Sequence, residues 1–474
     1  AGQFPYRDVW HPKGFLSFVP YVIVTAVFGH QMWGIRLFDL VWQFGSGLLI
    51  FQIGRQRMGN RGAVLAVGLF YLIYYNFGYW HIAQPEGFQI PVLLLSVWLY
   101  DRASQVKRPY RYLFASGFVI ALAPWFKQTA VVFIAALLLW AIYEHRPTNQ
   151  RADRSVAGHQ LVKTIGALFA GLTLANGLVL VFTAVTGMLA PMLEAFNFAF
   201  VDYPNQAHAG LLEMVPLTVN WGVWFPALIF PFLAGLCYLT GNRPLSPRWL
   251  GIMLMALAGL AAVYIQRHLW LYQLDSTLPF MALISAYAIE GSFVFLQALT
   301  NKRQKQIVWL FGFVLLSLVL PPINRIISYD TFILKYLTGQ TPRAEFLEEY
   351  ELLDVVDTAE YLTQHTAEDD PIFVWGHYAM LYYLANRPDP TRFINDPPLS
   401  IPNSHQTAWR EEAMIDLTAD PPVYIIVATD DDTDFEPQTT QEQLADFPAL
   451  NAFLNGRYRL ETTIGALELY RIVE

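Results

Sequence analysis

The sequence predicts a mainly α, polytopic helical membrane protein with a small extracytoplasmic α/β domain at its C-terminal end. Three observations lead to this fold class. The 474 residues are 55% hydrophobic and only 14% charged, and the mean hydropathy of +0.34 exceeds that of soluble domains. Apolar runs about as long as a bilayer crossing recur along residues 37–322. In residues 340–474, Asp, Glu, Pro and Thr replace these runs.

The charge and cysteine content exclude several classes of protein. The formal charge of −8 argues against a nucleic-acid partner. The basic residues form short clusters between apolar runs, where they indicate membrane topology instead. The single cysteine, Cys237, lies inside an apolar run. One thiol forms neither an internal disulfide nor a multi-cysteine metal site, so we expect no disulfide framework.

Residues 2–29, GQFPYRDVWHPKGFLSFVPYVIVTAVFG, begin with charged and aromatic residues and then become apolar. The apolar part, residues 15–29, is shorter than a membrane span and is interrupted by Pro20. We therefore expect residues 1–36 to be an outer-face loop with an interfacial helix. Since the chain begins at Ala1 already outside, we also expect a missing upstream membrane helix. Aromatic residues that favour headgroup depth flank the apolar part: Tyr6, Trp10, Tyr21 and Trp33.

Residues 37–322 are predicted to form a transmembrane domain of about ten helices. The runs 111–126 and 128–144 also permit one bent element around APWFKQT. The candidate helices are residues 37–54, 62–79, 86–101, 111–126, 128–144, 162–186, 217–240, 248–264, 277–298 and 306–322.

Basic residues predict the orientation. If all these helices span, the basic loops lie on one side, which is cytoplasmic by the positive-inside rule. The opposite loops, 80–85, 187–216 and 265–276, hold one basic residue between them, Arg267, and Lys127 lies alone at a tight turn. By the same alternation, the C-terminal domain is extracytoplasmic. The cytoplasmic clusters are Arg55, Arg57 and Arg61; Arg102, Lys107, Arg108 and Arg111; Arg146, Arg151, Arg154 and Lys163; Arg243 and Arg248; and Lys302, Arg303 and Lys305.

Residues 340–474 contain the patterns of a small α/β domain. The segment AEFLEEYELLDVVDTAEYLTQHT has helical periodicity. The short apolar runs PIFVWG and VYIIVAT are bounded by turn residues and are typical of buried strands. The final YRLETTIGALELYRI indicates a hairpin around Ile464 and Gly465.

The first outer segment, GQFPYRDVWHPKGFLSFVPYVIVTAVFG followed by WGIRLFDL, resembles the first outer loop of the GT-C glycosyltransferases. It is similar to polyprenyl-phosphate-sugar-dependent members of glycosyltransferase family 39, the protein mannosyltransferases and their bacterial aminoarabinose transferase relatives. AQPEGFQIPVLLL, GFVIALAPWFKQTA, QRHLWLYQLDSTLPFMAL and DDPIFVWGHYAMLYYLANRPDPTRF are similar to later segments in the same order. The resemblance therefore extends over nearly the whole chain.

This resemblance implies transfer of a hexose or pentose from a polyprenyl-phosphate-linked donor to a lipid, glycan or protein acceptor on the outer face, usually with inversion. A carboxylate must take the proton of the acceptor hydroxyl, and cations must stabilise the departing phosphate. The resemblance allows for a divalent cation, Mg²⁺ or Mn²⁺, held by carboxylates, with the metal ligands unknown. Membrane lipids are the other expected partners.

Two acidic residues are candidates for the catalytic role. The family's principal acid precedes the segment that here begins at Pro5, so it is absent from this chain, and Asp8 is the nearest substitute. Asp8 is equally explained as a turn carboxylate paired with Arg7 or Lys13. Glu86, in HIAQPEGF, lies at the outer end of a helix where the family often has its second acid. Its alternative role is helix capping beside Pro85.

Six residues are candidates for binding the donor phosphate and sugar. Lys127 is also explained by snorkelling of its ammonium to the headgroups. Arginine suits bidentate phosphate binding, although Arg267 can equally anchor a lipid phosphate. The candidates are Lys13, Lys127, Arg267, His268, Tyr272 and Gln273.

Three other features are weighed against simpler explanations. The outer loop 187–216, with Glu194, Asp202, His208 and Glu213, suits a lid over the acceptor or an amphipathic interfacial helix. The run TDDDTDFE at Asp430 is interpreted as a solvated loop, because it lacks the glycine of a calcium loop. His377 is interpreted as structural.

The alternative functions are a transporter or flippase of lipid-linked sugars and a non-catalytic structural homologue. Ionisable residues within the spans are few, with Asp39 and Glu290 the clear ones, and the halves do not repeat. The bacterial relatives look closer than those of the endoplasmic reticulum, so we expect the bacterial plasma membrane.

Overall fold

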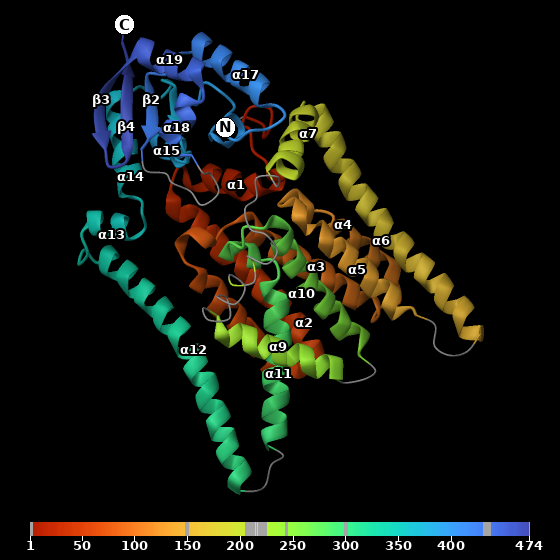
Figure 1. Ribbon diagram of the computed structural model, residues 1–474. Helices are drawn as coiled ribbons and strands as arrows, with labels where there is room; N and C mark the ends of the chain where they lie inside the picture. The colour runs from red at the N-terminus through yellow and green to blue at the C-terminus, as the bar shows by residue number, and fades with distance from the viewer. Residues whose placement is uncertain are drawn as a thin grey trace.

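The computed structural model describes residues 3–146, 151–203, 214, 216, 225–241, 245–297, 302–429 and 438–473. It confirms the predicted fold class, because apolar helices form one body and a small sheet with flanking helices forms the C-terminal domain above it (Figure 1). By length and composition, four described helices can cross a membrane: Met32–Phe77, Ala157–Val185, Pro247–Gln266 and Leu278–Phe295. The sequence predicts about ten crossings, because it also counts apolar runs shorter than this length criterion allows.

The outer-face segment is a 3₁₀ turn, η1 (Phe15–Phe18), followed by the helix α1 (Val19–Phe28). Pro20 lies in the first turn of α1, where a missing N–H costs nothing, and the 3₁₀ turn before it ends at Phe18, so the apolar run is divided into two elements beside Pro20. In Figure 1, α1 lies between the helical body and the C-terminal domain. Val22 and Val27 are 65% and 66% exposed, as a helix on a lipid surface requires.

The helical body begins with α2 (Met32–Tyr74), which is broken at Gly59. The φ of Gly59 is +77°, a conformation that glycine adopts without strain, so the predicted runs 37–54 and 62–79 are two helices joined at the basic turn. Two 3₁₀ turns separate α4 from α5, which excludes the single bent element. The remaining helices are α3 (Pro85–Ala103), α4 (Pro109–Ile120), α5 (Val131–Glu144), α6 (Arg151–Val185), α9 (Pro226–Gly241), α10 (Pro247–Gln266), α11 (Leu278–Gln297) and α12 (Lys302–Leu337).

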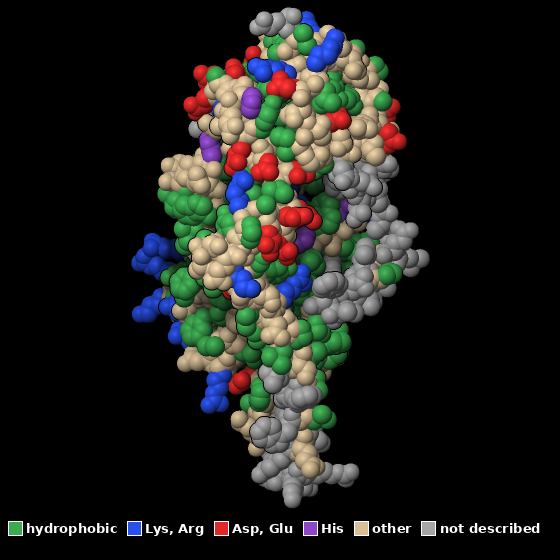
Figure 2. Space-filling view, turned by 90° about the vertical axis from the view of Figure 1, so that its left-hand side faces the viewer, with side chains coloured by type: hydrophobic (Ala, Val, Ile, Leu, Met, Phe, Trp, Pro, Cys, Tyr) green, Lys and Arg blue, Asp and Glu red, His purple; other side chains and the backbone are tan. Residues whose placement is uncertain are grey.

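Three predicted cytoplasmic loops meet at one end of this body. The Nη1 of Arg57 lies 2.7 Å from Oδ2 of Asp101, and both side chains are almost fully buried. Arg57 also donates to the carbonyl of Arg248, and Arg248 donates to Ser104. Figure 2 shows basic side chains at the edge of the largely hydrophobic lower part, whereas both charge signs mix on the C-terminal domain at the top.

The C-terminal domain contains a four-stranded sheet with the order β1-β2-β4-β3. β1 (Ile372–Trp375) and β2 (Tyr424–Ala428) are parallel and buried, whereas β3 (Tyr458–Ile464) and β4 (Leu467–Ile472) form the antiparallel hairpin around Gly465. The helices are α13 (Arg343–Glu349), α14 (Leu353–His365), α15 (Met380–Ala385), α16 (Pro397–Ser400), α17 (Gln406–Ala419), α18 (Thr440–Ala445) and α19 (Pro448–Arg457).

The C-terminal domain is joined to the outer segments by a shared apolar core. Trp10 packs edge-on against Trp409 and Phe198, at 5.5 and 5.2 Å between ring centroids. Arg392 binds Glu412 at 2.7 Å, lies 3.5 Å from Glu194 of α7 (Leu189–Asn197), and donates to the carbonyl of Tyr6. The described part of loop 187–216 is therefore docked on this domain, and His208 and Glu213 lie outside the described residues.

Substitution of Gly171 tests the close packing of α4 against α6. A Cβ at Gly171 would collide with the carbonyl oxygen of Phe114, whereas a Cβ at Gly177 of the same helix meets open space. We expect Gly171→Ala to destabilise the protein by about 1–3 kcal/mol and Gly177→Ala to leave its stability nearly unchanged. Thermal unfolding in detergent measures both, and equal effects of the two variants would contradict this packing.

Candidate active site

The central feature of the site is a buried ion pair between the start of α3 and the turn that connects α4 with α5. Nζ of Lys127 lies 2.9 Å from Oε1 of Glu86. The Glu86 side chain is 2% exposed and that of Lys127 is 14% exposed, so Lys127 is the outer member of the pair. Oε2 of Glu86 has no hydrogen-bond partner among the described residues. The pair thus contains one carboxylate oxygen that can accept a further proton or hydrogen bond.

Neighbouring side chains fix both partners of this pair. Glu86 occupies the first turn of α3, where the helix dipole favours a negative charge. The buried Gln89, one turn further along, donates to the carbonyl oxygens of Ala123 and Lys127 at 3.3 and 3.2 Å. These two bonds hold the backbone of the turn that carries Lys127 against α3, so the position of Lys127 does not depend on its flexible side chain alone.

A buried polar network lies behind the first turn of α3. The Tyr74 hydroxyl donates to Oδ1 of Asp39 at 2.8 Å. Gln43 donates to the same carboxylate, to Tyr74 and to the carbonyl of Gly87. Asp39, noted in the sequence as an ionisable residue within a span, therefore supports the helix end that carries Glu86.

The turn after α10 brings aromatic rings to the ion pair. Nζ of Lys127 lies 5.8 Å from the ring centroid of Tyr272. Tyr272 in turn neighbours Trp270 at 5.5 Å, and Trp270 stacks on His268 at 4.8 Å. Arg267 ends α10 with a φ of +58° and is exposed. A strained backbone of this kind is common where a turn presents side chains to a ligand.

Two polar side chains of this turn are buried without hydrogen-bond partners among the described residues. These are Gln273, at 1% exposure, and Asp275, which is fully buried. Burial raises the pKa of Asp275 well above its ordinary value, and the neighbouring charge of Glu86 raises it further. Asp275 was not singled out in the sequence, because a single Asp in the apolar segment LYQLDSTLP carries no motif of its own.

Lys13 approaches the pair from the N-terminal segment. The Tyr6 hydroxyl donates to the carbonyl of Lys13 at 2.7 Å, and Gln128 donates to that of Pro12 at 2.6 Å. Burial lowers the pKa of Lys13 to about 8, the charge of Lys127 lowers it as well, and Glu86 raises it. The structure thus brings Lys13, Lys127 and Glu86 together from three distant parts of the sequence.

Asp8 has a different environment. Its carboxylate accepts two hydrogen bonds from Arg7, at 2.7 and 2.8 Å, and one from the backbone N–H of Phe4. The bond from Arg7 is the main reason why the pKa of Asp8 lies below its ordinary value. These contacts are those of a turn carboxylate, and Arg7 itself donates to the carbonyl of Thr186.

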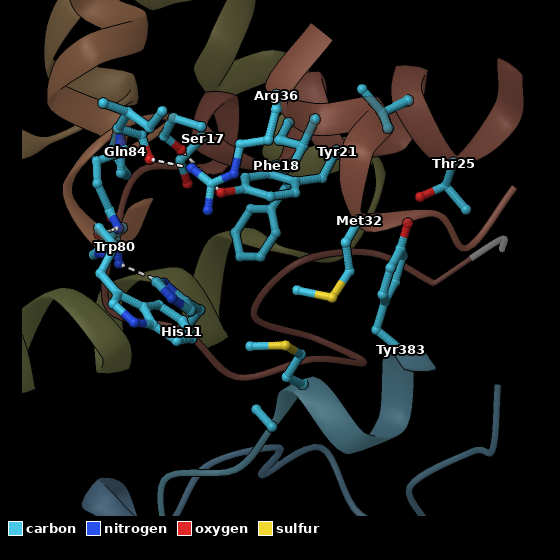
Figure 3. Close-up of a pocket in the computed structure, with 18 of the residues that line it drawn as sticks. His11, Ser17, Phe18, Tyr21, Thr25, Met32, Arg36, Trp80, Gln84 and Tyr383 are labelled. Atoms are coloured by element: carbon cyan, nitrogen blue, oxygen red, sulfur yellow. Dashed lines mark hydrogen bonds between the residues drawn. The ribbon is translucent and has the colours of Figure 1, made fainter. Parts of the chain in front are cut away.

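A cavity of about 540 Å³ opens between the outer-face segment and the C-terminal domain, and its lining reaches Pro85 but includes neither Glu86 nor Lys127. Lys13, Gln84 and Pro85 line it, and Arg36 of α2 points into it, with His11 and Trp80 on one side and Met32 and Tyr383 on the other (Figure 3). Sequence reasoning missed Arg36 and His11 as site residues. The signal for Arg36 was present, because an arginine near the end of an apolar span is rarely placed there without a partner.

The remaining sequence predictions have separate outcomes. His377 lies 3.4 Å from Asp396 in the C-terminal domain, and its structural interpretation stays a prediction. The acidic run at Asp430 lies outside the described residues. Within the described chain, no group of three or more His, Cys, Asp or Glu side chains is placed to hold a metal ion.

The comparisons with known proteins agree with this fold. Residues 17–170 match the family model described as dolichyl-phosphate-mannose-protein mannosyltransferase. No curated protein matches the chain. Among solved structures, ArnT from Cupriavidus metallidurans bound to undecaprenyl phosphate is similar with a TM-score of 0.57 at 13% identity, covering 98% of this chain and 88% of that chain. The archaeal oligosaccharyltransferase AglB from Archaeoglobus fulgidus, in complex with an inhibitory peptide and a dolichol-phosphate, has a TM-score of 0.52 at 12% identity, covering 98% and 67%.

The helical body, the small C-terminal domain and these likenesses define the class of protein. The chain has the GT-C fold of integral membrane glycosyltransferases. With the family match at its N-terminal part, it is a glycosyltransferase of this fold class, as the resemblance in the sequence implied.

Titration of Lys13 tests the electrostatics of the site. Because Lys127 lowers the pKa of Lys13 and Glu86 raises it, we expect Lys127→Gln to move that pKa upward from about 8 and Glu86→Gln to move it downward. NMR of the ¹³C-dimethylated lysine follows each titration. Shifts of the same sign in both variants would show that the three side chains do not interact in this way.

Proposed function

We propose that this protein transfers a sugar from a polyprenyl-phosphate-linked donor to an acceptor on the extracytoplasmic face of a bacterial plasma membrane, with inversion at the anomeric carbon. The observation that carries this proposal is the buried Glu86–Lys127 pair, a carboxylate and a cation held 2.9 Å apart between the start of α3 and the turn that connects α4 with α5. ArnT and AglB, which share the fold, were solved with undecaprenyl phosphate and a dolichol-phosphate. The lipid carrier of the donor is inferred for this chain from that likeness.

The orientation follows from the distribution of basic residues. Arg57 and Arg248 meet at one end of the helical body. Glu86 and Lys127 lie at the start of α3 and in the turn between α4 and α5, and Pro85, beside Glu86, lines a cavity together with Met380 of the C-terminal domain. Basic loops favour the cytoplasmic side. The site and the C-terminal domain therefore face outward in this proposal.

The two members of the pair supply what the reaction needs. The acceptor O–H bond breaks and its proton passes to Glu86, while the acceptor oxygen forms a bond to the anomeric carbon. The bond from that carbon to the phosphate oxygen breaks, and its electron pair leaves with the phosphate. Lys127 stabilises the charge that the polyprenyl phosphate gains.

The burial of the pair suggests an order of events. Because Lys127 is the more exposed partner, an arriving phosphate meets its ammonium first. A phosphate that draws Nζ away from Oε1 uncovers the Glu86 carboxylate, which is otherwise 2% exposed. The base thus becomes available once the donor is bound, and this disfavours reaction with water before the acceptor arrives.

The other predicted residues take supporting roles. Arg267, His268 and Tyr272, on the turn next to Lys127, bind the donor phosphate and sugar, and Gln273 lies buried behind them. Asp8 is committed to its turn, so the proposal places the base at Glu86. No group of three or more His, Cys, Asp or Glu is placed to hold a metal ion among the described residues, and a role for Mg²⁺ or Mn²⁺ stays a prediction.

Transfer by a Glu86 variant is the decisive experiment. The purified full chain, reconstituted in nanodiscs with a radiolabelled sugar on undecaprenyl phosphate and membrane extract as acceptor, is expected to form labelled product. Glu86→Gln should lower the rate by about 10²–10⁴-fold, the usual contribution of a general base. Glu144→Gln is the matched control, because this carboxylate binds Tyr100 at the far end of α5.

The outcomes separate the rival functions. A carrier moves labelled lipid across the bilayer without releasing its sugar, and Glu86→Gln leaves that flux intact. A non-catalytic homologue gives neither product nor flux. Either result, obtained with folded protein, would overturn the proposal.

A further inference from the structure

Asp275 is a buried carboxyl group with no part in the transfer step proposed above. It follows the 3₁₀ turn η8 (Leu271–Leu274) and comes shortly before α11, and its side chain is fully buried. Neither of its oxygens has a hydrogen-bond partner among the described residues. A buried carboxylate without hydrogen bonds is costly, so such a group either holds a proton or takes part in a reaction.

Two other carboxyl groups lie at the same turn of α3. A Cβ at Gly87, the residue after Glu86, would lie 3.3 Å from Oδ2 of Asp275 and 2.7 Å from the Tyr74 hydroxyl. That hydroxyl donates to Oδ1 of Asp39 at 2.8 Å. Asp275 is therefore separated from the network that holds Asp39 only by a glycine of the turn that carries Glu86.

The contacts indicate which of the three carboxyl groups carries a proton. Glu86 has the ammonium of Lys127 as its partner, and Asp39 accepts two hydrogen bonds. Asp275 has neither, and three negative charges in one buried site repel one another. Burial raises the pKa of Asp275 well above its ordinary value, and the charges of Glu86 and Asp39 raise it further. Asp275 is therefore the neutral member of the group.

The three carboxyl groups also keep oxygens that accept no hydrogen bond from the described residues. These are Oε2 of Glu86, both oxygens of Asp275 and Oδ2 of Asp39. Lys127 covers Glu86, which is 2% exposed, from the outer side. A proton taken up by Glu86 thus has a short way inward, toward Asp275, and a blocked way outward.

We propose that Asp275 relays the proton of the reaction from Glu86 to Asp39 and so restores the Glu86 carboxylate after each transfer. The O–H bond of protonated Glu86 breaks, and its proton passes to one oxygen of Asp275. The O–H bond that Asp275 already holds breaks, and that proton passes to Oδ2 of Asp39, directly or through one water. Glu86 ends as a carboxylate, Asp275 stays neutral and Asp39 gains the proton.

The relay ends at the cavity between the outer-face segment and the C-terminal domain. Arg36, one turn before Asp39 on α2, lines this cavity, and water there takes the proton from Asp39. Asp275 acts through Glu86 and does not contact the substrate. The relay rests on the proposed function, because it restores the base that the transfer uses.

Infrared difference spectroscopy of the full chain in nanodiscs, without substrate, tests where the proton lies. The C=O band of a buried protonated carboxyl group should be present in the unmodified protein and absent in Asp275→Asn, whose amide has the shape of the neutral acid. Because the charge of Glu86 raises the pKa of Asp275, Glu86→Gln should lower the pH at which this band disappears. The other titratable side chains that interact with Asp275 are Asp39, Tyr74 and Tyr272.

The kinetics of transfer test what the proton does. Since Glu86 starts as a carboxylate, Asp275→Asn should complete its first turnover at nearly the unmodified rate and later turnovers about tenfold or more slowly, which gives a burst of labelled product. The solvent deuterium isotope effect on the later turnovers should rise. Asp39→Asn, which keeps an oxygen for the Tyr74 hydroxyl, is the second variant and should give the same burst. Ser276→Ala, at the buried neighbour of Asp275, is the packing control and should give none.

The outcomes separate the relay from a structural role and from failure of the proposed function. If Asp275→Asn slows the first and the later turnovers equally, Asp275 is structural and the relay is overturned. It is also overturned if the band persists in Asp275→Asn, or if Glu86→Gln leaves its titration unchanged. If the unmodified protein forms no product while the band behaves as expected, the proposed function fails and the relay with it, whereas the assignment of the proton to Asp275 stands.

Discussion

The arrangement of the site depends on one buried ion pair, Glu86 with Lys127. Removing two charges from water costs several kcal/mol for each, and this cost is offset only while the partners stay together. The pair therefore fixes the start of α3 against the turn between α4 and α5, and Gln89 repeats that link through the backbone. Gln128, next to Lys127, holds the N-terminal segment that carries Lys13. Loss of either charge thus disturbs the geometry of this whole end of the helical body.

A comparison with the other buried pair shows why this one suits chemistry. Arg57 and Asp101 are closed off, with further bonds from Arg57 to the carbonyls of Ile53 and Arg248. Such a pair joins helices and offers nothing to a substrate. Lys127 instead stays partly exposed, at 14% against 1% for Arg57. Each pair has a carboxylate oxygen without a hydrogen-bond partner among the described residues, Oε2 of Glu86 and Oδ1 of Asp101, so the difference lies in the exposure of the cation.

Much of the fold was predictable because bilayer length and hydropathy act on each segment separately. The apolar runs that lie in the described residues fall on helices, and the strands and hairpin of the C-terminal domain follow from short buried runs and Gly465. Glu86 and Lys127 were each notable as ionisable residues at helix ends, yet nothing local in the sequence says that they pair. The role of Asp8 could not be decided from the sequence, because a turn carboxylate and a catalytic one look alike there, and its contacts in the structure are those of a turn carboxylate. Arg36 was not recognised as a site residue in the sequence, because the groups it contacts, the Ile82 carbonyl and the Tyr79 ring, come from a distant turn.

The most direct measurement is a cryo-EM structure of the full chain with undecaprenyl phosphate bound. We expect the phosphate within hydrogen-bond distance of Nζ of Lys127, with that nitrogen moved away from Oε1 of Glu86 and the carboxylate uncovered. A phosphate bound elsewhere, with the 2.9 Å pair intact, would contradict the claim that this pair is the reaction centre.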